Sequence, residues 1–221
     1  AENPPDISAQ LTGQTGGDGG WFVSDVGVTF TVTEPVVPIL ATSGCGTSRV
    51  DIDGGFVGTA VVTQDGPDTQ VPCSATTSGG TSSVTVSVRR DATAPRISCP
   101  PTVVAPATSV DGAAVSFPQV DAVDQIDPAP QVTLSHPSGA TFPLGRTVVT
   151  ATATDHVGHV SECTFAVEVR DGEAPTLTCP GPELSAAFGV PLDDAATASD
   201  DLDPAPRLTY SAPPGTVFPS G

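Results

Sequence analysis

The sequence contains no lysine and no methionine, and only one tryptophan and one tyrosine occur among its 221 residues. All seven basic residues are arginine, against 25 acidic residues, and the formal net charge is −18. Nucleic-acid binding is excluded because the basic surface it needs is missing. Chemistry that depends on lysine, such as Schiff-base formation, is excluded too. Because no run of 18 apolar residues occurs, no membrane span is expected.

Bulky core residues are scarce, but the composition is still that of a folded chain. Glycine and proline together fall short of the low-complexity range, with 23 and 24 residues. Valine outnumbers leucine by 29 to nine, which favours strands over helices. Apolar residues alternate in stretches such as 28–32, 84–88 and 163–169, and glycine-rich turns separate such stretches. The sequence therefore predicts an all-β fold of tandem immunoglobulin-like Greek-key β-sandwiches, arranged as beads on a string.

The chain repeats part of itself. Residues 91–100 match residues 171–180 at an offset of 80, and residues 124–145 match residues 200–221 at an offset of 76. The second copy stops at the counterpart of Gly145, so we expect it to lack its last two strands. The predicted domains are a first β-sandwich at 1–90, a complete repeat at 91–170 and an incomplete second repeat at 171–221.

Five cysteines are widely spaced, without a zinc-ligand pattern, which favours disulfides made in an oxidising, extracellular compartment. Cys99 and Cys163 both fall on the core-facing parity of their strands, so we expect a bridge between them inside the core. Cys45 is the expected partner of Cys73. Cys179 is expected to be unpaired because the sequence is cut from a longer protein.

These residues resemble the hyalin repeat, or HYR domain. The resemblance is carried by Ala94-Pro95-Arg-Ile-Ser-Cys99-Pro100, by Phe142-Pro143-Leu-Gly145, by Ala153-Thr154-Asp155-His-Val-Gly158 and by Cys163-Thr-Phe-Ala-Val-Glu-Val169. It spans residues 91–170 fully and 171–221 in part. Residues 1–90 look like an immunoglobulin-like module of bacterial surface proteins. The resemblance implies an immunoglobulin-like fold, an extracellular location and a role in adhesion.

The acidic turns are the sharpest candidate site. They recur in both copies and, together with the aspartates that open each linker, they could supply oxygen ligands to calcium. The alternative is that aspartate simply starts turns and keeps the chain soluble, and no EF-hand order is present. The candidate calcium ligands are Asp91, Asp121, Asp124, Asp127, Asp171, Asp200 and Asp203.

Other sites are weaker. His156 and His159 follow Asp155, but histidines three residues apart on a strand-to-turn segment are not expected to converge on a metal. No catalytic constellation is recognisable, so an enzyme is not expected. Sugar binding would need an aromatic platform, and Trp21 and Tyr210 lie in different modules. Trp21 is instead expected to pack beside Phe22 and Phe30.

The predicted function is that of a non-catalytic extracellular stalk or cell-surface adhesion region, either secreted or surface-attached. Its expected partners are an extracellular protein or glycan and the adjacent repeats of the same chain. No cofactor is required, although calcium is a candidate ligand. The alternative is an accessory spacer or glycan-binding region of a secreted multidomain hydrolase.

Overall fold

The structure is a computed structural model that describes residues 2–17, 19–180, 196–212 and 214–217. Within these ranges all regular secondary structure is β-strand, and no helix long and apolar enough to cross a membrane occurs there. By its internal contacts the chain forms two compact units. The first comprises residues 1–99, 120–134 and 151–163, and the second comprises residues 100–119, 135–150 and 164–221.

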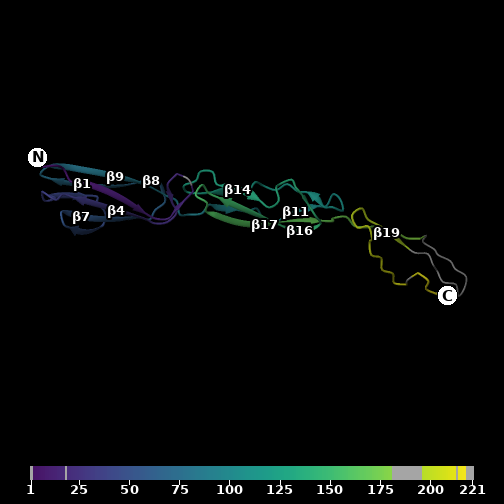
Figure 1. The fold of residues 1–221 in the computed structure, drawn as a ribbon. Coiled ribbons are helices and arrows are strands. Elements are labelled where there is room, and N and C mark those ends of the chain that lie inside the picture. The colour runs from purple at the N-terminus through teal and green to yellow at the C-terminus, as the bar shows by residue number, and fades with distance from the viewer. Residues whose placement is uncertain (1, 18, 181–195, 213, 218–221) are drawn as a thin grey trace. The chain divides into compact units, whose positions relative to one another are not determined.

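Two sheets are built from the first 90 residues, and Figure 1 labels several of their strands. One sheet has the order β1-β4-β7-β6, with β1 (Asp6–Thr12), β4 (Val26–Thr33), β7 (Gly55–Val62) and β6 (Ser48–Ile52). The other has the order β2-β3-β9-β8-β5, with β2 (Thr15–Gly16), β3 (Trp21–Phe22), β9 (Gly80–Arg90), β8 (Gly66–Thr77) and β5 (Ala41–Ser43).

The two sheets share one core. Along β4, every second side chain is fully buried, because successive residues of a strand point to opposite faces. These side chains cluster with buried residues of β7, β8 and β9, namely Phe56, Val62, Cys73, Ala75 and Val88. Two sheets packed over a common core make a β-sandwich, which is the architecture of immunoglobulin-like domains. The all-β class predicted from the valine-rich alternation is thus confirmed.

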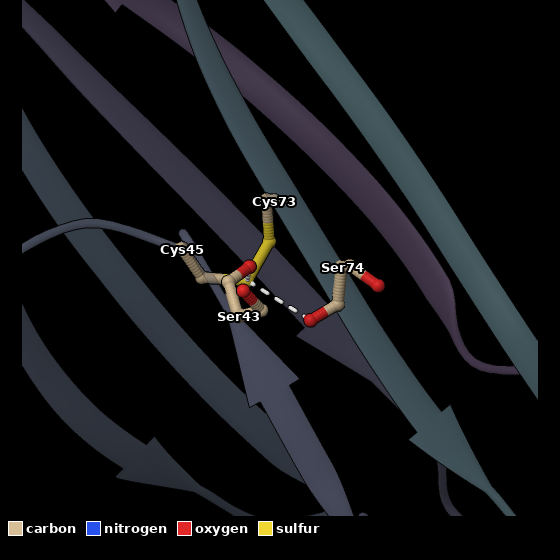
Figure 2. The surroundings of a disulfide bond; sticks show 4 residues. All are labelled: Ser43, Cys45, Cys73 and Ser74. Atoms are coloured by element: carbon tan, nitrogen blue, oxygen red, sulfur yellow. Dashed lines mark hydrogen bonds between the residues drawn. A yellow bond between two sulfur atoms is a disulfide. The ribbon is translucent and has the colours of Figure 1, made fainter.

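A disulfide ties β8 to the loop between β5 and β6. Cys45 and Cys73 are bonded with an S–S distance of 2.02 Å, and both are buried in the core. Figure 2 shows this bridge beside Ser43 and Ser74. The Cys45 sulfur lies 3.5 Å from the Ser74 carbonyl oxygen. The bridge therefore fills a core position as well as cross-linking the chain.

Residues 91–170 contribute further strands. A sheet of order β11-β17-β16-β14 contains β11 (Val103–Pro106), β17 (Val160–Arg170), β16 (Gly145–Thr154) and β14 (Gln131–Leu134). Two small antiparallel pairs join β10 (Arg96–Ser98) to β13 (Asp121–Val123) and β12 (Ala113–Ala114) to β15 (Thr141–Phe142). In the second unit Phe117 packs edge-on against Phe142 and Phe165, with ring centroids 6.3 and 4.9 Å away.

The second disulfide joins Cys99 to Cys163 with an S–S distance of 2.00 Å. Both cysteines are half-buried, so the expectation that this bridge lies inside the core is wrong. The reason lies in β17, where the side chains from Val160 to Thr164 alternate between exposed and half-buried. Full burial in this strand begins only at Phe165.

The second repeat contributes one strand pair to the described residues, β18 (Thr176–Thr178) with β19 (Thr197–Ser199). Cys179 follows β18 and is an exposed free cysteine. Residues 218–221, the end of the second motif, lie outside the described residues. The domain boundaries at 90 and 170 and the arrangement as beads on a string stay predictions.

Candidate functional site

Asp91 is the residue from which the candidate site is built. It follows the last residue of β9, and its backbone N–H donates to the Phe22 carbonyl at 2.9 Å. This bond draws the residue inward, and Asp91 is 0% exposed. Its Oδ1 accepts the Thr93 N–H at 3.4 Å, whereas its Oδ2 is buried without a hydrogen-bond partner. Such an orphaned buried oxygen is rare because desolvating it is costly.

Asp155, at the end of β16, is the second buried carboxylate. Its Oδ1 accepts three backbone N–H groups of the following turn, those of Val157, Gly158 and His159, at 3.0, 2.8 and 2.8 Å. Its Oδ2 lies 2.9 Å from Nδ1 of His159. Gly158 has a φ of +96°, a backbone conformation that favours glycine, and this lets the turn wrap around the carboxylate.

Asp91 and Asp155 face each other. A carboxylate oxygen of each and a ring nitrogen of His159 all lie within 4.8 Å of one another. Nδ1 of His156 lies 3.6 Å from Oδ2 of Asp91 and 3.9 Å from Oδ2 of Asp127. Around Asp91 the first unit thus gathers four ionisable side chains from two segments, Asp127 and the stretch from Asp155 to His159.

The pKa of Asp91 is raised above its ordinary value, chiefly by burial and then by the negative charge of Asp124. The carboxylate of Asp155 raises this pKa further. The Thr93 N–H and His156 act in the opposite direction without cancelling the rise. The site is thus a pocket of negative charge that is short of a compensating cation.

The acidic turn holds Asp124 and Asp127 by local hydrogen bonds. Oδ1 of Asp124 accepts the N–H groups of Ile126 and Asp127 at 2.8 and 2.9 Å, and Oδ1 of Asp127 accepts the Ala129 N–H at 2.9 Å. Turn formation, the alternative role for these aspartates, therefore accounts for one oxygen of each carboxylate. The second oxygen of Asp127 lies 3.9 Å from Nδ1 of His156.

The second acidic turn reproduces this local geometry. Oδ1 of Asp200 accepts the N–H groups of Leu202 and Asp203, and Oδ1 of Asp203 accepts the Ala205 N–H, at 2.8–2.9 Å. The N–H groups of Asp203 and Leu202 lower the pKa of Asp200, the reverse of the shift at Asp91. Asp200 is half-buried, as Asp124 is, whereas Asp203 is exposed and Asp127 is half-buried.

The nearest arginine is already committed. The Arg90 guanidinium donates to the carboxylates of Asp65 and Asp25 and, through Nε at 3.0 Å, to the Ser24 carbonyl. Asp65 also accepts the Ala92 N–H at 3.0 Å. Arg90 therefore fixes the backbone on either side of Asp91, but the charge of Arg90 is compensated by Asp25 and Asp65.

The structure thus gathers three of the seven predicted calcium ligands, Asp91, Asp124 and Asp127, in one region. Asp121 is exposed in β13, where it pairs with Ser98, and Asp171 is exposed with its Oδ1 on the Glu173 N–H. Asp155 was not among the predicted ligands. Its signal in the sequence was the position of an aspartate at a strand end, three residues before a glycine, where it wraps a turn.

The two histidines stand beside different carboxylates, Asp91 for His156 and Asp155 for His159. Each ring turns to a carboxylate, so both contribute to the site although they do not converge on one point. The Trp21 ring meets His156 edge-on, with ring centroids 4.6 Å apart, a contact that the sequence did not predict.

Comparison with known proteins places this site in context. The HYR domain family model matches residues 90–169. Hyalin of Lytechinus variegatus is 31% identical over 154 residues, which cover 64% of this chain and 29% of hyalin. A Rattus norvegicus protein with sushi, von Willebrand factor type A, EGF and pentraxin domains is 31% identical over 160 residues, covering 69% of this chain and 4% of that protein.

Among solved structures, the protocadherin gammaB7 EC3-6 cis-dimer aligns with 89% of this chain and 61% of its own chain, at 18% identity and a TM-score of 0.43. The chain spans less than a third of the length of the two relatives in sequence. Residues 90–169, which hold Asp91, the acidic turn and Asp155, therefore match the HYR domain family.

Proposed function

We propose that this chain is a non-catalytic extracellular repeat region that acts as a semi-rigid stalk or adhesion module. The observation that carries the proposal is the way the linker after β9 is fixed. Asp91 and Pro95 are both buried, and Pro95 accepts a hydrogen bond from the Ser161 hydroxyl through its carbonyl oxygen at 2.5 Å. Proline also fixes its own φ and restricts the residue before it. Such a segment acts as a joint of limited bending.

Two further features support an extracellular stalk. Both disulfides are of the kind that persists in an oxidising compartment, and they cross-link segments of an otherwise thin core. The net charge of −18 keeps such a chain soluble and discourages self-association. Adjacent repeats and an extracellular protein or glycan are the partners that fit this role. We also propose that residues 1–90 form an immunoglobulin-like module of the kind found in bacterial surface proteins.

The stalk role is tested by small-angle X-ray scattering on the full chain and on a variant with a Gly-Ser-Gly-Ser insertion after Thr93. The insertion separates Asp91 from Pro95 and should broaden the distribution of interatomic distances, because the joint becomes a flexible tether. A control insertion of the same length after Gly172 lies in an exposed segment and leaves the spacing between Asp91 and Pro95 unchanged. It should therefore not reproduce the scattering change of the insertion after Thr93. If the insertion after Thr93 leaves the distribution unchanged, the joint is already flexible and the stalk proposal is wrong.

The competing accessory role is examined by binding of the full chain to an array of extracellular polysaccharides. Specific retention on one glycan would favour a glycan-binding region attached to a hydrolase. The aromatic candidates offer little for this: Trp21 is half-buried against His156, and the Tyr210 hydroxyl donates to the Ala196 carbonyl at 2.9 Å. We therefore expect no specific glycan retention.

A further inference from the structure

The buried orphan oxygen of Asp91 calls for a partner that the described part of the chain does not supply. Protonation would not satisfy it, because the added O–H would lack an acceptor at the oxygen that has no hydrogen-bond partner. The positive charge of Arg90 is taken up by Asp25 and Asp65. His156 is the remaining neighbour, and its nitrogen stands 3.6 Å away, beyond good hydrogen-bond distance.

We propose that Asp91 and Asp155 are ligands of a calcium site in the first unit, with the acidic turn of Asp124 and Asp127 adding negative charge beside it. Calcium binds carboxylate oxygens at about 2.3–2.6 Å, so two ligands of one ion lie at most about 5 Å apart. The oxygens of Asp91 and Asp155 meet this condition, since both lie within the group of atoms that spans 4.8 Å. The inference stands whether or not the chain is a stalk.

The hydrogen bonds around these aspartates hold each carboxylate in place, and Oδ2 of Asp155 is also held, 2.9 Å from Nδ1 of His159. Asp124, Asp127 and Asp155 each use Oδ1 to accept backbone N–H groups, which fixes the carboxylate in place. Asp91 is fixed in the same way, through the Thr93 N–H. The Oδ2 atoms of Asp91 and Asp127 both face Nδ1 of His156, so a cation in this space would meet carboxylate oxygens held by the backbone.

Calcium is the first candidate because the two carboxylates supply oxygens, which hard cations prefer. Nδ1 of His159 lies 2.9 Å from Oδ2 of Asp155, and the other ring nitrogen would suit a softer metal. Zinc is therefore the ion against which calcium must be compared. Magnesium is less suitable because it demands near-ideal octahedral geometry and gives up its water reluctantly.

The second linker provides a matched control within the chain. Asp171 opens the same D-x-x-A-P motif as Asp91 and makes the same bond to the N–H two residues later. Unlike Asp91, Asp171 is exposed. An Asp171→Asn substitution therefore removes an equivalent charge from an equivalent linker without touching the proposed site.

The test measures thermal unfolding of the full chain in 10 mM CaCl2 and in EGTA, with NaCl added to equal ionic strength. We expect calcium to raise the Tm by several degrees, on the order of 5 °C, and magnesium to have a smaller effect. Isothermal titration of the metal-free chain should give a Kd of about 10⁻³ M or tighter, the range of extracellular calcium modules. Asp91→Asn should abolish the calcium-dependent rise, and Asp171→Asn should retain it.

Asp91→Asn also separates a ligand from a merely structural residue. In EGTA this variant should be at least as stable as the unsubstituted chain, because it removes a buried charge that has no partner. A purely structural Asp91 would instead make the variant less stable by the same amount with and without calcium, which would overturn the proposal. It would also be overturned if NaCl reproduced the calcium effect, or if zinc alone raised the Tm.

Discussion

Gly58 lies in β7 between two neighbouring strands, opposite Phe30 of β4 and Arg49 of β6. A Cβ atom at this position would stand 1.9 Å from the carbonyl oxygen of Cys45. Glycine thus brings the disulfide-bearing loop against the sheet at a distance that no other residue allows. Its role is close approach, since its φ lies outside the positive range in which glycine is favoured.

Gly58→Ala should lower the free energy of unfolding by about 2 kcal/mol, because the loop holding Cys45 must move away from β7. Gly172→Ala is the control, since a Cβ there meets nothing within 4 Å. Urea unfolding of both variants, followed by the fluorescence of Trp21, measures the difference. Equal stability of the two variants would show that the loop adapts without cost.

Asp155 allows a second prediction at the residue scale. In EGTA, Asp155→Ala should lower the free energy of unfolding by about 2–3 kcal/mol, because three N–H groups of the turn lose their acceptor. Asp155→Asn keeps an oxygen in place of Oδ1 and should cost less. Chemical denaturation of the two variants distinguishes these outcomes, and a larger loss for Asn would contradict the prediction.

The residue scale is also where the sequence was least informative. It marked Asp91, Asp124 and Asp127 because acidic residues recur with the repeat, yet it marked Asp171 and Asp200 for the same reason. Burial distinguishes Asp91 from Asp171, and it depends on which segments pack together, whereas Asp124 and Asp200 are both half-buried. Asp155 was named in the repeat motif and beside the two histidines but not as a calcium ligand, because a single aspartate before a turn is common.

At the scale of the element, alternation predicted the strands well. In β4 the buried side chains fall on every second residue, as period-two patterning requires. The cysteines paired from strand parity, Cys99 and Cys163, are those that the structure joins. Parity could not predict how deeply they are buried, because the depth along β17 depends on which part of the strand the opposite layer covers.

Loss of the bridge between Cys99 and Cys163 should lower the free energy of unfolding by about 4 kcal/mol, from the entropy of closing a loop with a sequence separation of 64 residues. The double variant Cys99→Ser, Cys163→Ser tests this while keeping the other bridge. The bridge between Cys45 and Cys73 closes a 28-residue separation. Its serine double variant should lose slightly less stability through loop entropy and more through the cavity left in the core. Calorimetry of both variants compares the two bridges.

At the scale of the whole molecule, the charge balance and the repeat predicted the kind of protein, and the HYR match at residues 90–169 agrees with the repeat. The acidic cluster required the structure, since its members are separated by up to 64 positions in the sequence, from Asp91 to Asp155. No local sequence pattern predicts that these residues lie close together, because their proximity depends on how the segments pack.

The bridge from Cys99 to Cys163 has a mechanical consequence for any chain that transmits tension. A pull on the two ends bypasses the stretch between these cysteines, which would otherwise lengthen by roughly 220 Å when drawn straight. An optical-tweezers trace of the chain should gain roughly 310 Å of contour when a reductant cleaves both bridges, and the serine double variant at 99 and 163 should show roughly 220 Å of that gain before reduction. Oxidation state would then set how far the molecule stretches before it breaks.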